Sequence, residues 1–248
     1  IPGPARDHTE RMLAAMGVPL ECAGSWITLP ADRPTSLQPL DLTVPGDISS
    51  AAFPLVAAAI VPHSEITLVN IGANETRTGL LEMLQAMGAR FSIQNERQTG
   101  GEPAVDLLVR FEELHAANVG GDTVVRGIDE FPVLAVAATQ AAGTSTVTDA
   151  GELRVKEVDR ISVLAAELRR MGVPIEERAD GFSIHGPLRL QGAAVNSHDD
   201  HRLAMSLAVA GLVADSPTLI ENAQCAHDSF PGFVKVMQTL GADMAWDD

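Results

Sequence analysis

Residues 49–61 read SSAAFPLVAAAIV, a run rich in alanine that stays apolar around almost the whole circumference of a helix. Two later runs share this character, EFPVLAVAATQAA at 130–142 and HRLAMSLAVAGLVA at 201–214. A helix that is apolar on all sides belongs inside a protein, and small side chains let neighbouring backbones approach closely. The sequence therefore predicts three buried helices that form the centre of the fold.

Each of these runs opens a longer repeat. A short β-rich stretch follows each one, at residues 66–70, 145–148 and 218–220. An amphipathic segment then ends in glycine and a small apolar residue, a pattern typical of a left-handed helix C-cap. Strand-like residues come next, at 90–94, 174–177 and 243–246. The repeat unit is thus a buried helix, a strand, an amphipathic helix and further strands, and three units are complete.

A fourth copy of the amphipathic segment, at residues 7–18, has no small-residue helix before it. A unit that begins in its middle indicates that further chain precedes Ile1. The turn-forming Pro45-Gly46-Asp47 marks the natural boundary. We expect residues 1–43 to be the end of another domain and residues 44–248 to be a three-repeat domain. The alternative is that residues 1–43 form an ordinary N-terminal subdomain.

Composition excludes several classes of function. The 248 residues include 17 basic and 33 acidic side chains, a formal charge of −16, which disfavours nucleic acid as a partner. The longest apolar runs are shorter than the roughly 18 residues that span a bilayer, so we expect no membrane-spanning segment and no membrane partner. Two cysteines and no secretory signal predict a cytoplasmic protein. Neither a metal site nor a cofactor is expected.

The densest charge cluster is ELRVKEVDR at residues 152–160. Helical spacing places Glu157 on the apolar stripe of residues 161, 164 and 168, between Lys156 and Arg160. One interpretation is a solvated first helical turn held by local ion pairs. The other is a cleft in which the two cations bind an anion at a helix N-terminus and the carboxylate moves protons.

Other polar residues stand at the starts of predicted helices. Arg202 opposes the helix dipole in a first turn unless an anion is bound, which favours a functional role. A metal site built on neighbouring histidines is a weaker alternative. Asp129 fits either an N-cap, like Asp47 and Asp199, or a functional carboxylate. Arg6 and Arg77 fit either anion ligands or surface residues.

The sequence His227-Asp228-Ser229 contains the residue types of a hydrolase triad. Adjacent residues rarely converge as a triad, and the chain has no Gly-x-Ser-x-Gly elbow. We therefore discount this interpretation.

The heptapeptide RVKEVDR at 154–160 resembles the RVKE(S/T)DR motif of the 3-phosphoshikimate 1-carboxyvinyltransferase (EPSP synthase) family. Five further motifs resemble that family in the same order: PGDISSAAF (45–53), TRTGL (76–80), IDEFP (128–132), DHRLAM (200–205) and SFPGF (229–233). RDHTE at 6–10 resembles the bacterial branch often described as glyphosate-tolerant. The resemblance implies an α/β enolpyruvyl transferase fold, an inside-out α/β barrel of repeated βαβαββ units in two domains. This chain would then be the C-terminal portion, with the N-terminal half absent.

The resemblance also implies a reaction. The family transfers an enolpyruvyl group from phosphoenolpyruvate to the 5-hydroxyl of shikimate 3-phosphate, through a tetrahedral ketal that eliminates phosphate. By position in the motifs, Asp129 would activate the hydroxyl, Glu157 would donate a proton to the methylene carbon and Lys156 would bridge the substrates. Arg160 and Arg202 would hold phosphoenolpyruvate. Arg6, from the other domain, would contact the shikimate phosphate.

Two positions depart from the family pattern. Val158 replaces the usual serine or threonine, and Asp228 stands where some members have lysine. Two alternatives remain open: a relative of UDP-N-acetylglucosamine enolpyruvyl transferase, and a non-catalytic domain fragment that binds a partner or ligand. On the leading interpretation the isolated chain is inactive, and its partners are the two substrates and the missing N-terminal half.

Overall fold

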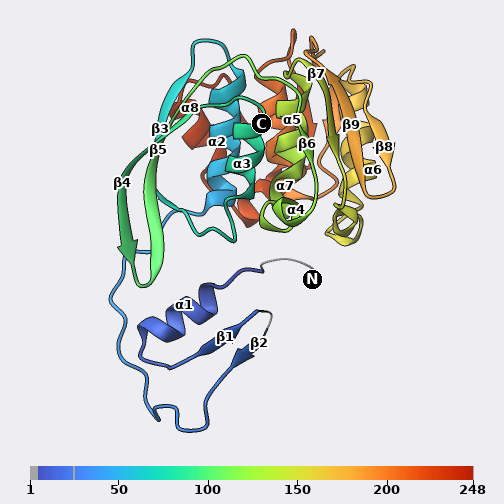
Figure 1. The fold of residues 1–248 in the computed structure, drawn as a ribbon. Helices are drawn as coiled ribbons and strands as arrows, with labels where there is room; N and C mark the ends of the chain where they lie inside the picture. Colours follow the sequence, from blue (N-terminus) through green and yellow to red (C-terminus); the bar gives the residue numbers. More distant parts are fainter. Residues whose placement is uncertain (1–4, 25, 248) are drawn as a thin grey trace.

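The three small-residue helices form the centre of the molecule in the computed structural model, which describes residues 5–24 and 26–247. They are α2 (Ile48–Ile60), α5 (Phe131–Thr139) and α7 (His201–Gly211), and they pack against one another (Figure 1). All nine residues of α5 are buried, as are all but Ser50 in α2. The prediction of a core built from these three runs is confirmed.

Sheets lie outside these helices, as Figure 1 shows. The first sheet has the order β3-β5-β4 and is antiparallel throughout. The second has the order β6-β7-β9-β8, with β6 and β7 parallel. The strands β10 and β11 form a further, two-stranded parallel sheet. The strands are β3 (Glu65–Gly72), β4 (Phe91–Thr99), β5 (Glu102–Arg110), β6 (Asn118–Val119), β7 (Gly143–Val147), β8 (Glu176–Arg178), β9 (Gly181–Gly186), β10 (Ala194–Asn196) and β11 (Leu219–Glu221).

The first two units follow the βαβαββ order that the family resemblance implies, and the third unit follows it as far as α8. In each unit, the segment before the buried helix pairs in parallel with the strand after it. The pairs are Gly46 with Ile71 around α2, β6 with β7 around α5, and β10 with β11 around α7. In the first unit β5 lies between β3 and β4, and in the second β9 lies between β7 and β8. The apolar helices inside and the sheets outside give the inside-out arrangement.

Amphipathic helices connect the strands: α1 (His8–Ala15), α3 (Gly79–Ala86), α6 (Arg160–Arg170) and α8 (Phe233–Thr239). All four end at a glycine with positive φ, between 84° and 98°. At Gly88 a Cβ atom would also lie 2.7 Å from the His115 ring, so the site excludes a side chain. The predicted glycine caps are confirmed.

One predicted strand is wrong. Residues 243–246 follow α8 but belong to no strand in the part of the chain that the structure describes. The equivalent segments β4 and β8 each pair with the strand that follows them, β5 and β9. A strand needs such a hydrogen-bonding neighbour, and none of the described residues lies there.

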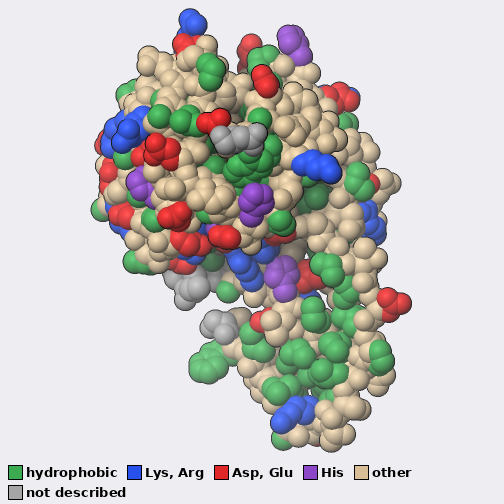
Figure 2. Space-filling view, turned by 180° about the vertical axis from the view of Figure 1, so that it is seen from behind, with side chains coloured by type: hydrophobic (Ala, Val, Ile, Leu, Met, Phe, Trp, Pro, Cys, Tyr) green, Lys and Arg blue, Asp and Glu red, His purple; other side chains and the backbone are tan. Residues whose placement is uncertain are grey.

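Residues 5–24 and 26–44 lie below the main body in Figure 1 and comprise α1 and the antiparallel pair of β1 (Glu21–Ala23) and β2 (Trp26–Thr28). None of the residues of α1 is buried, and Trp26 and Ile27 expose 78% and 55% of their surface. Figure 2 shows hydrophobic side chains gathered over this lower lobe. Within residues 5–24 and 26–247, no helix is long and apolar enough to cross a bilayer.

Candidate active site

The N-terminal ends of α2, α5 and α7 meet at the end of the core that faces α1. Five predicted residues come together there: Arg6, Asp129, Lys156, Arg160 and Arg202. They come from the segment before α1, from a short 3-10 helix before α5 (Ile128–Glu130), from the loop before α6 and from the first turns of α6 and α7. Positive helix termini and four cations thus converge on one region of an acidic chain.

Asp129 is the centre of this cluster. Its carboxylate forms an ion pair with Arg6 and lies 3.4 Å from Arg160, 3.6 Å from Arg202 and 3.7 Å from Lys156. Burial alone would raise the pKa of Asp129, but the charges of Arg202, Arg6 and Lys156 outweigh it and lower this pKa to about 2. Asp129 is therefore an ionised carboxylate at neutral pH.

The N-cap interpretation of Asp129 does not hold, because the described structure gives its side chain cationic partners and Glu130 precedes α5. The true caps are elsewhere. Asp47 accepts a hydrogen bond from the Ser50 amide at 3.0 Å. Asp200, rather than the predicted Asp199, caps α7 by accepting from the Arg202 amide at 2.8 Å.

Arg160 is almost completely buried, with 1% of its side chain exposed. Its Nε donates to Asp200 at 2.8 Å and its Nη2 to Glu157 at 2.6 Å, while Nη1 donates to Asp129 at 3.4 Å. Asp200 is itself fully buried. One guanidinium thus ties together three carboxylates from three elements, an arrangement that fixes its position.

Glu157 does not lie on the buried stripe of α6, so that prediction is wrong. Asp159 caps this helix by accepting from the Ser162 amide at 3.0 Å, and the helix begins at Arg160. Glu157 therefore precedes the helix, and half of its side chain is exposed. The buried cation Arg160 occupies the inward position instead.

Lys156 lies beside the cluster with 22% of its side chain exposed. Its Nζ is 3.0 Å from Glu152, an i,i+4 pair of the kind expected for a solvated turn. The same Nζ also reaches to 3.7 Å from Asp129. Local pairs are present, but the contacts of Lys156 and Arg160 with Asp129 go beyond a solvated helical turn.

Arg202 lies in the first turn of α7 with 14% of its side chain exposed. Its Nη1 donates to the Asp129 carbonyl at 3.2 Å and lies 3.6 Å from the Glu130 carboxylate. Burial raises the pKa of Glu130. The Ser49 hydroxyl donates to Glu130 and accepts from Arg77 at 2.7 Å.

Glu130 and Ser49 were not among the predicted site residues. Each is a polar residue at the start of an otherwise apolar, buried helix, and such a residue needs a polar partner. That position is the signal that could have identified them. Arg77, which the sequence left open, pairs with Ser49 and with Asp47 at 2.9 Å.

The remaining polar candidates lie outside this cluster or lack the needed geometry. His227 stacks on Trp246 at 5.0 Å, and its Nδ1 faces the Gln224 carbonyl, so no triad forms with its neighbours. Burial and the nearby Arg202 lower the pKa of His201. Residues 5–24 and 26–247 hold no group of three or more His, Cys, Asp or Glu able to bind a metal.

The arrangement can bind anions while keeping a carboxylate ionised among them. Arg6, Lys156 and Arg202 are each partly exposed, so their remaining donors are available to phosphate or carboxylate groups. Arg160 lies in the same cluster, held by Asp200, Glu157 and Asp129. The carboxylates of Asp129 and Glu157 lie on either side of the Arg160 guanidinium, where one can accept and the other donate a proton.

Comparison with known proteins places this site in context. The sequence model of EPSP synthase (3-phosphoshikimate 1-carboxyvinyltransferase) matches residues 1–237. The 3-phosphoshikimate 1-carboxyvinyltransferase of Synechococcus elongatus is 52% identical over 239 residues, 96% of this chain and 53% of the relative. That of Gloeobacter violaceus is 53% identical over 92% of this chain and 52% of the relative. The chain thus spans about half the length of the curated relatives it matches.

Two solved structures have a similar fold. An EPSP synthase from Acinetobacter baumannii superposes with a TM-score of 0.92 at 40% identity, over 96% of this chain and 55% of that one. The enolpyruvyl transferase NikO from Streptomyces tendae superposes with a TM-score of 0.74 over 93% of this chain and 51% of that one. At 21% identity, the second comparison supports the fold alone.

Proposed function

This chain belongs to the EPSP synthase family, and on that premise we propose that it is the C-terminal portion of an enzyme that transfers the enolpyruvyl group of phosphoenolpyruvate to the 5-hydroxyl of shikimate 3-phosphate. The observation that carries this proposal is the convergence of four cations on the ionised Asp129. Both substrates are anions with several negative charges, and a cluster of arginine and lysine provides the donors they need. We also propose a cytoplasmic location for the enzyme.

The residue roles follow from the reaction. In the addition step the 5-hydroxyl oxygen bonds to C2 of phosphoenolpyruvate, the hydroxyl proton leaves and C3 gains a proton; elimination then breaks the C2–O bond to phosphate and returns a proton from C3. We assign the contact with the hydroxyl to Asp129 and proton transfer at C3 to Glu157. Lys156, whose Nζ lies 3.7 Å from Asp129, bridges the two substrates.

The remaining cations hold the substrates. Arg160 and Arg202 bind phosphoenolpyruvate, and Arg6 binds the phosphate of shikimate 3-phosphate. Substrate binding also explains how a carboxylate with a pKa near 2 can accept a proton. When Arg6 and Arg202 pair with substrate anions, their charges stabilise Asp129 less, and its basicity rises.

We propose that the rest of the protein supplies the missing half of the site and one strand of this domain. A groove of about 720 Å³ lies between β11 and residues 241–247. Its floor is apolar: Pro54 and Ala57 from α2, Ala204 and Ala208 from α7, and Val234 and Met237 from α8. In the other two units this position is filled by β5 or β9. The occupant we infer is a single strand, antiparallel to β11, with alternating apolar residues.

Residues 1–43 fit the same proposal as the end of the second domain. Their exposed apolar side chains, Met12, Trp26, Ile27, Leu29 and Leu37, form a surface suited to packing against that domain. The boundary at Pro45 separates this surface from the three-repeat domain.

The test is a phosphate-release assay with shikimate 3-phosphate and phosphoenolpyruvate on this chain alone and with the complementary N-terminal segment of a family member added in trans. We expect no turnover from the chain alone and turnover from the assembled pair, lost again with Asp129→Ala. Turnover by the chain alone would refute the need for the second half. A pair that co-elutes as a complex but releases no phosphate would refute the reaction.

A further inference from the structure

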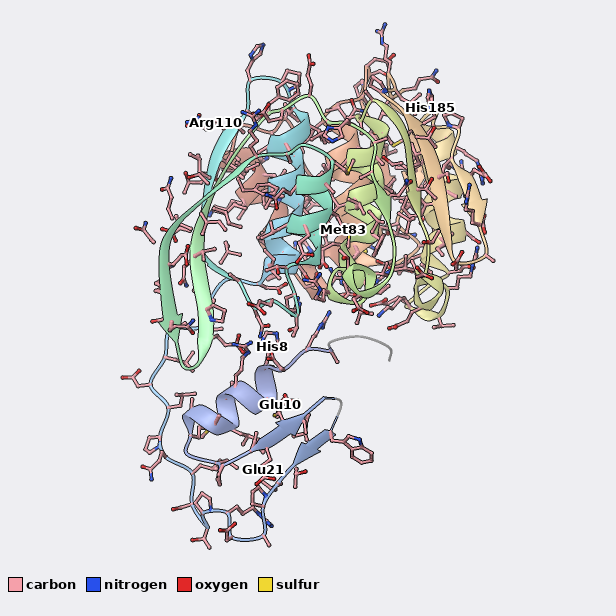
Figure 3. The ribbon with its side chains drawn as sticks, in the orientation of Figure 1. His8, Glu10, Glu21, Met83, Arg110 and His185 are labelled. Atoms are coloured by element: carbon pink, nitrogen blue, oxygen red, sulfur yellow. The ribbon has the colours of Figure 1, made fainter. Side chains whose placement is uncertain are left out.

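Arg6 reaches Asp129 from outside the three-repeat domain, so contacts with that domain must hold the segment of Arg6 in place. The helix that follows it, α1, has no buried residue and therefore gains little from apolar packing against the main body. The position of Arg6 must depend instead on a few polar contacts at the N-terminal end of α1. Figure 3 shows His8 at this junction, between α1 and the main body.

The centre of these contacts is Asn74, whose residue surface is 2% exposed in the turn between β3 and α3. Its Nδ2 donates to Asp7 at 2.7 Å and to Glu102 at 3.0 Å. Its Oδ1 accepts from the amide and hydroxyl of Thr76 at 2.9 and 2.8 Å. An amide side chain has two donors and two acceptor sites, so every hydrogen-bonding position of Asn74 is used.

Neighbouring groups strengthen the junction. His8 Nδ1 lies 2.8 Å from the second oxygen of Glu102. The other carboxylate oxygen of Asp7 accepts from Arg11 Nε at 2.8 Å. Burial would raise the pKa of Asp7, but the hydrogen bonds from Asn74 and Arg11 lower it. Asp7 is thus an ionised group held from both sides, directly next to Arg6.

We propose that Asn74 is a positioning residue: it anchors Asp7 across the boundary between residues 1–43 and the three-repeat domain, and thereby sets Arg6 against Asp129. The bearing on Arg6 rests on the proposed function, whereas the anchor itself is a property of the folded chain. If Asn74 only shaped the turn at Thr76, its replacement would change hydrogen exchange in residues 76–81 and leave exchange in α1 unchanged.

The test uses Asn74→Asp, which keeps an oxygen for Thr76 but turns the second oxygen toward the carboxylates of Asp7 and Glu102. At pH 8 we expect hydrogen exchange of the α1 amides to accelerate about tenfold or more, because two hydrogen bonds to charged groups are replaced by repulsion. Exchange in α2 and α5 stays unchanged. Asn118→Asp adds the same charge at an exposed site and is the matched control.

Asp7→Asn combined with Asn74→Asp exchanges donor and acceptor, so protection of α1 returns toward the wild-type value. The amide resonance of Asp129 reports on Arg6: in Asn74→Asp it moves to the position that it has in Arg6→Ala. Unchanged exchange in α1, or faster exchange confined to residues 76–81, would overturn the anchor. A fixed Asp129 resonance would overturn its link to Arg6. Because no readout is turnover, failure here is distinct from failure of the proposed reaction.

Discussion

Replacing Asp200 separates two contributions that one buried carboxylate makes. Its Oδ2 accepts from Arg160 at 2.8 Å, and its Oδ1 caps α7 through the amides of Arg202 and Leu203. Asp200→Asn keeps a good capping residue but removes the charge and replaces the oxygen that faces Arg160 with an amide nitrogen. Asp200→Ala removes both the cap and the charge.

The burial of both partners sets the expected size of the effect. Asp200 is fully buried and Arg160 is 1% exposed, so solvent does not screen the pair. Breaking a buried pair by deleting one partner costs about 3–5 kcal/mol, and losing an N-cap adds about 1 kcal/mol. We expect Asp200→Ala to lower the free energy of unfolding by about 4–6 kcal/mol. Asp200→Asn keeps the cap through its one oxygen but turns an amide NH2 donor toward Arg160 Nε, so it loses the pair and should lower the free energy of unfolding by about 3–5 kcal/mol.

The measurement is urea unfolding followed by circular dichroism, with the same slope required of every variant. Asp47→Asn is the matched control, because Asp47 caps α2 and pairs with Arg77 but has half of its side chain exposed. That variant should lose about 0.5 kcal/mol or less. If Asp200→Asn also costs about 0.5 kcal/mol or less, the buried charge pair does not hold Arg160 and the reasoning is wrong.

Three further predictions follow from the same contacts. Glu157→Gln should leave the free energy of unfolding within about 0.5 kcal/mol, since the side chain is half exposed, but should abolish phosphate release by the assembled enzyme; retained turnover would remove Glu157 from the mechanism. The pKa of Asp129 is about 2 in the folded chain and higher when unfolded, so its ionisation stabilises the fold by about 2 kcal/mol above pH 4, and this contribution disappears as the pH falls to 2. Unfolding measured from pH 2 to 6 should show that loss in the wild type but not in Asp129→Asn, and parallel curves would contradict the assignment. Ala208→Glu places a charge in the apolar groove and should weaken binding of the complementary half at least about tenfold by titration calorimetry, whereas Ile93→Glu on exposed β4 should not; equal affinities would exclude the groove as the docking site.

The core helices could be predicted from the sequence because a fully buried helix is apolar on every side. An all-apolar helix such as residues 49–61 has no face that could meet water, so its place in the core follows without knowledge of its neighbours. Glycine caps are equally local, since a left-handed residue at Gly17 or Gly172 depends on its own backbone alone.

The starts of helices and the contacts between distant segments were harder to predict. Periodicity extended the inward stripe of α6 to Glu157, but a period says nothing about where a helix begins; the Asp159 side chain, bonded to the Ser162 amide, sets that limit. The Ser49–Glu130 contact joins residues 81 positions apart, and periodicity gives the face of a helix rather than its partner. Residues 243–246 have strand-like composition, yet a strand exists only beside another.

The repeat also concentrates positive charge at one end of the core in a chain with a net charge of −16. Each unit directs the N-terminus of its buried helix to the same end of the core. Ser49 of α2, Glu130 directly before α5 and Arg202 of α7 are linked to one another there. The positive ends of three helix dipoles therefore add to the cations around Asp129. Acidic side chains elsewhere on the surface are screened over about 8 Å at physiological salt, so they do not cancel this local field. Three copies of one folding unit thus concentrate positive potential at one point, which no single copy could do.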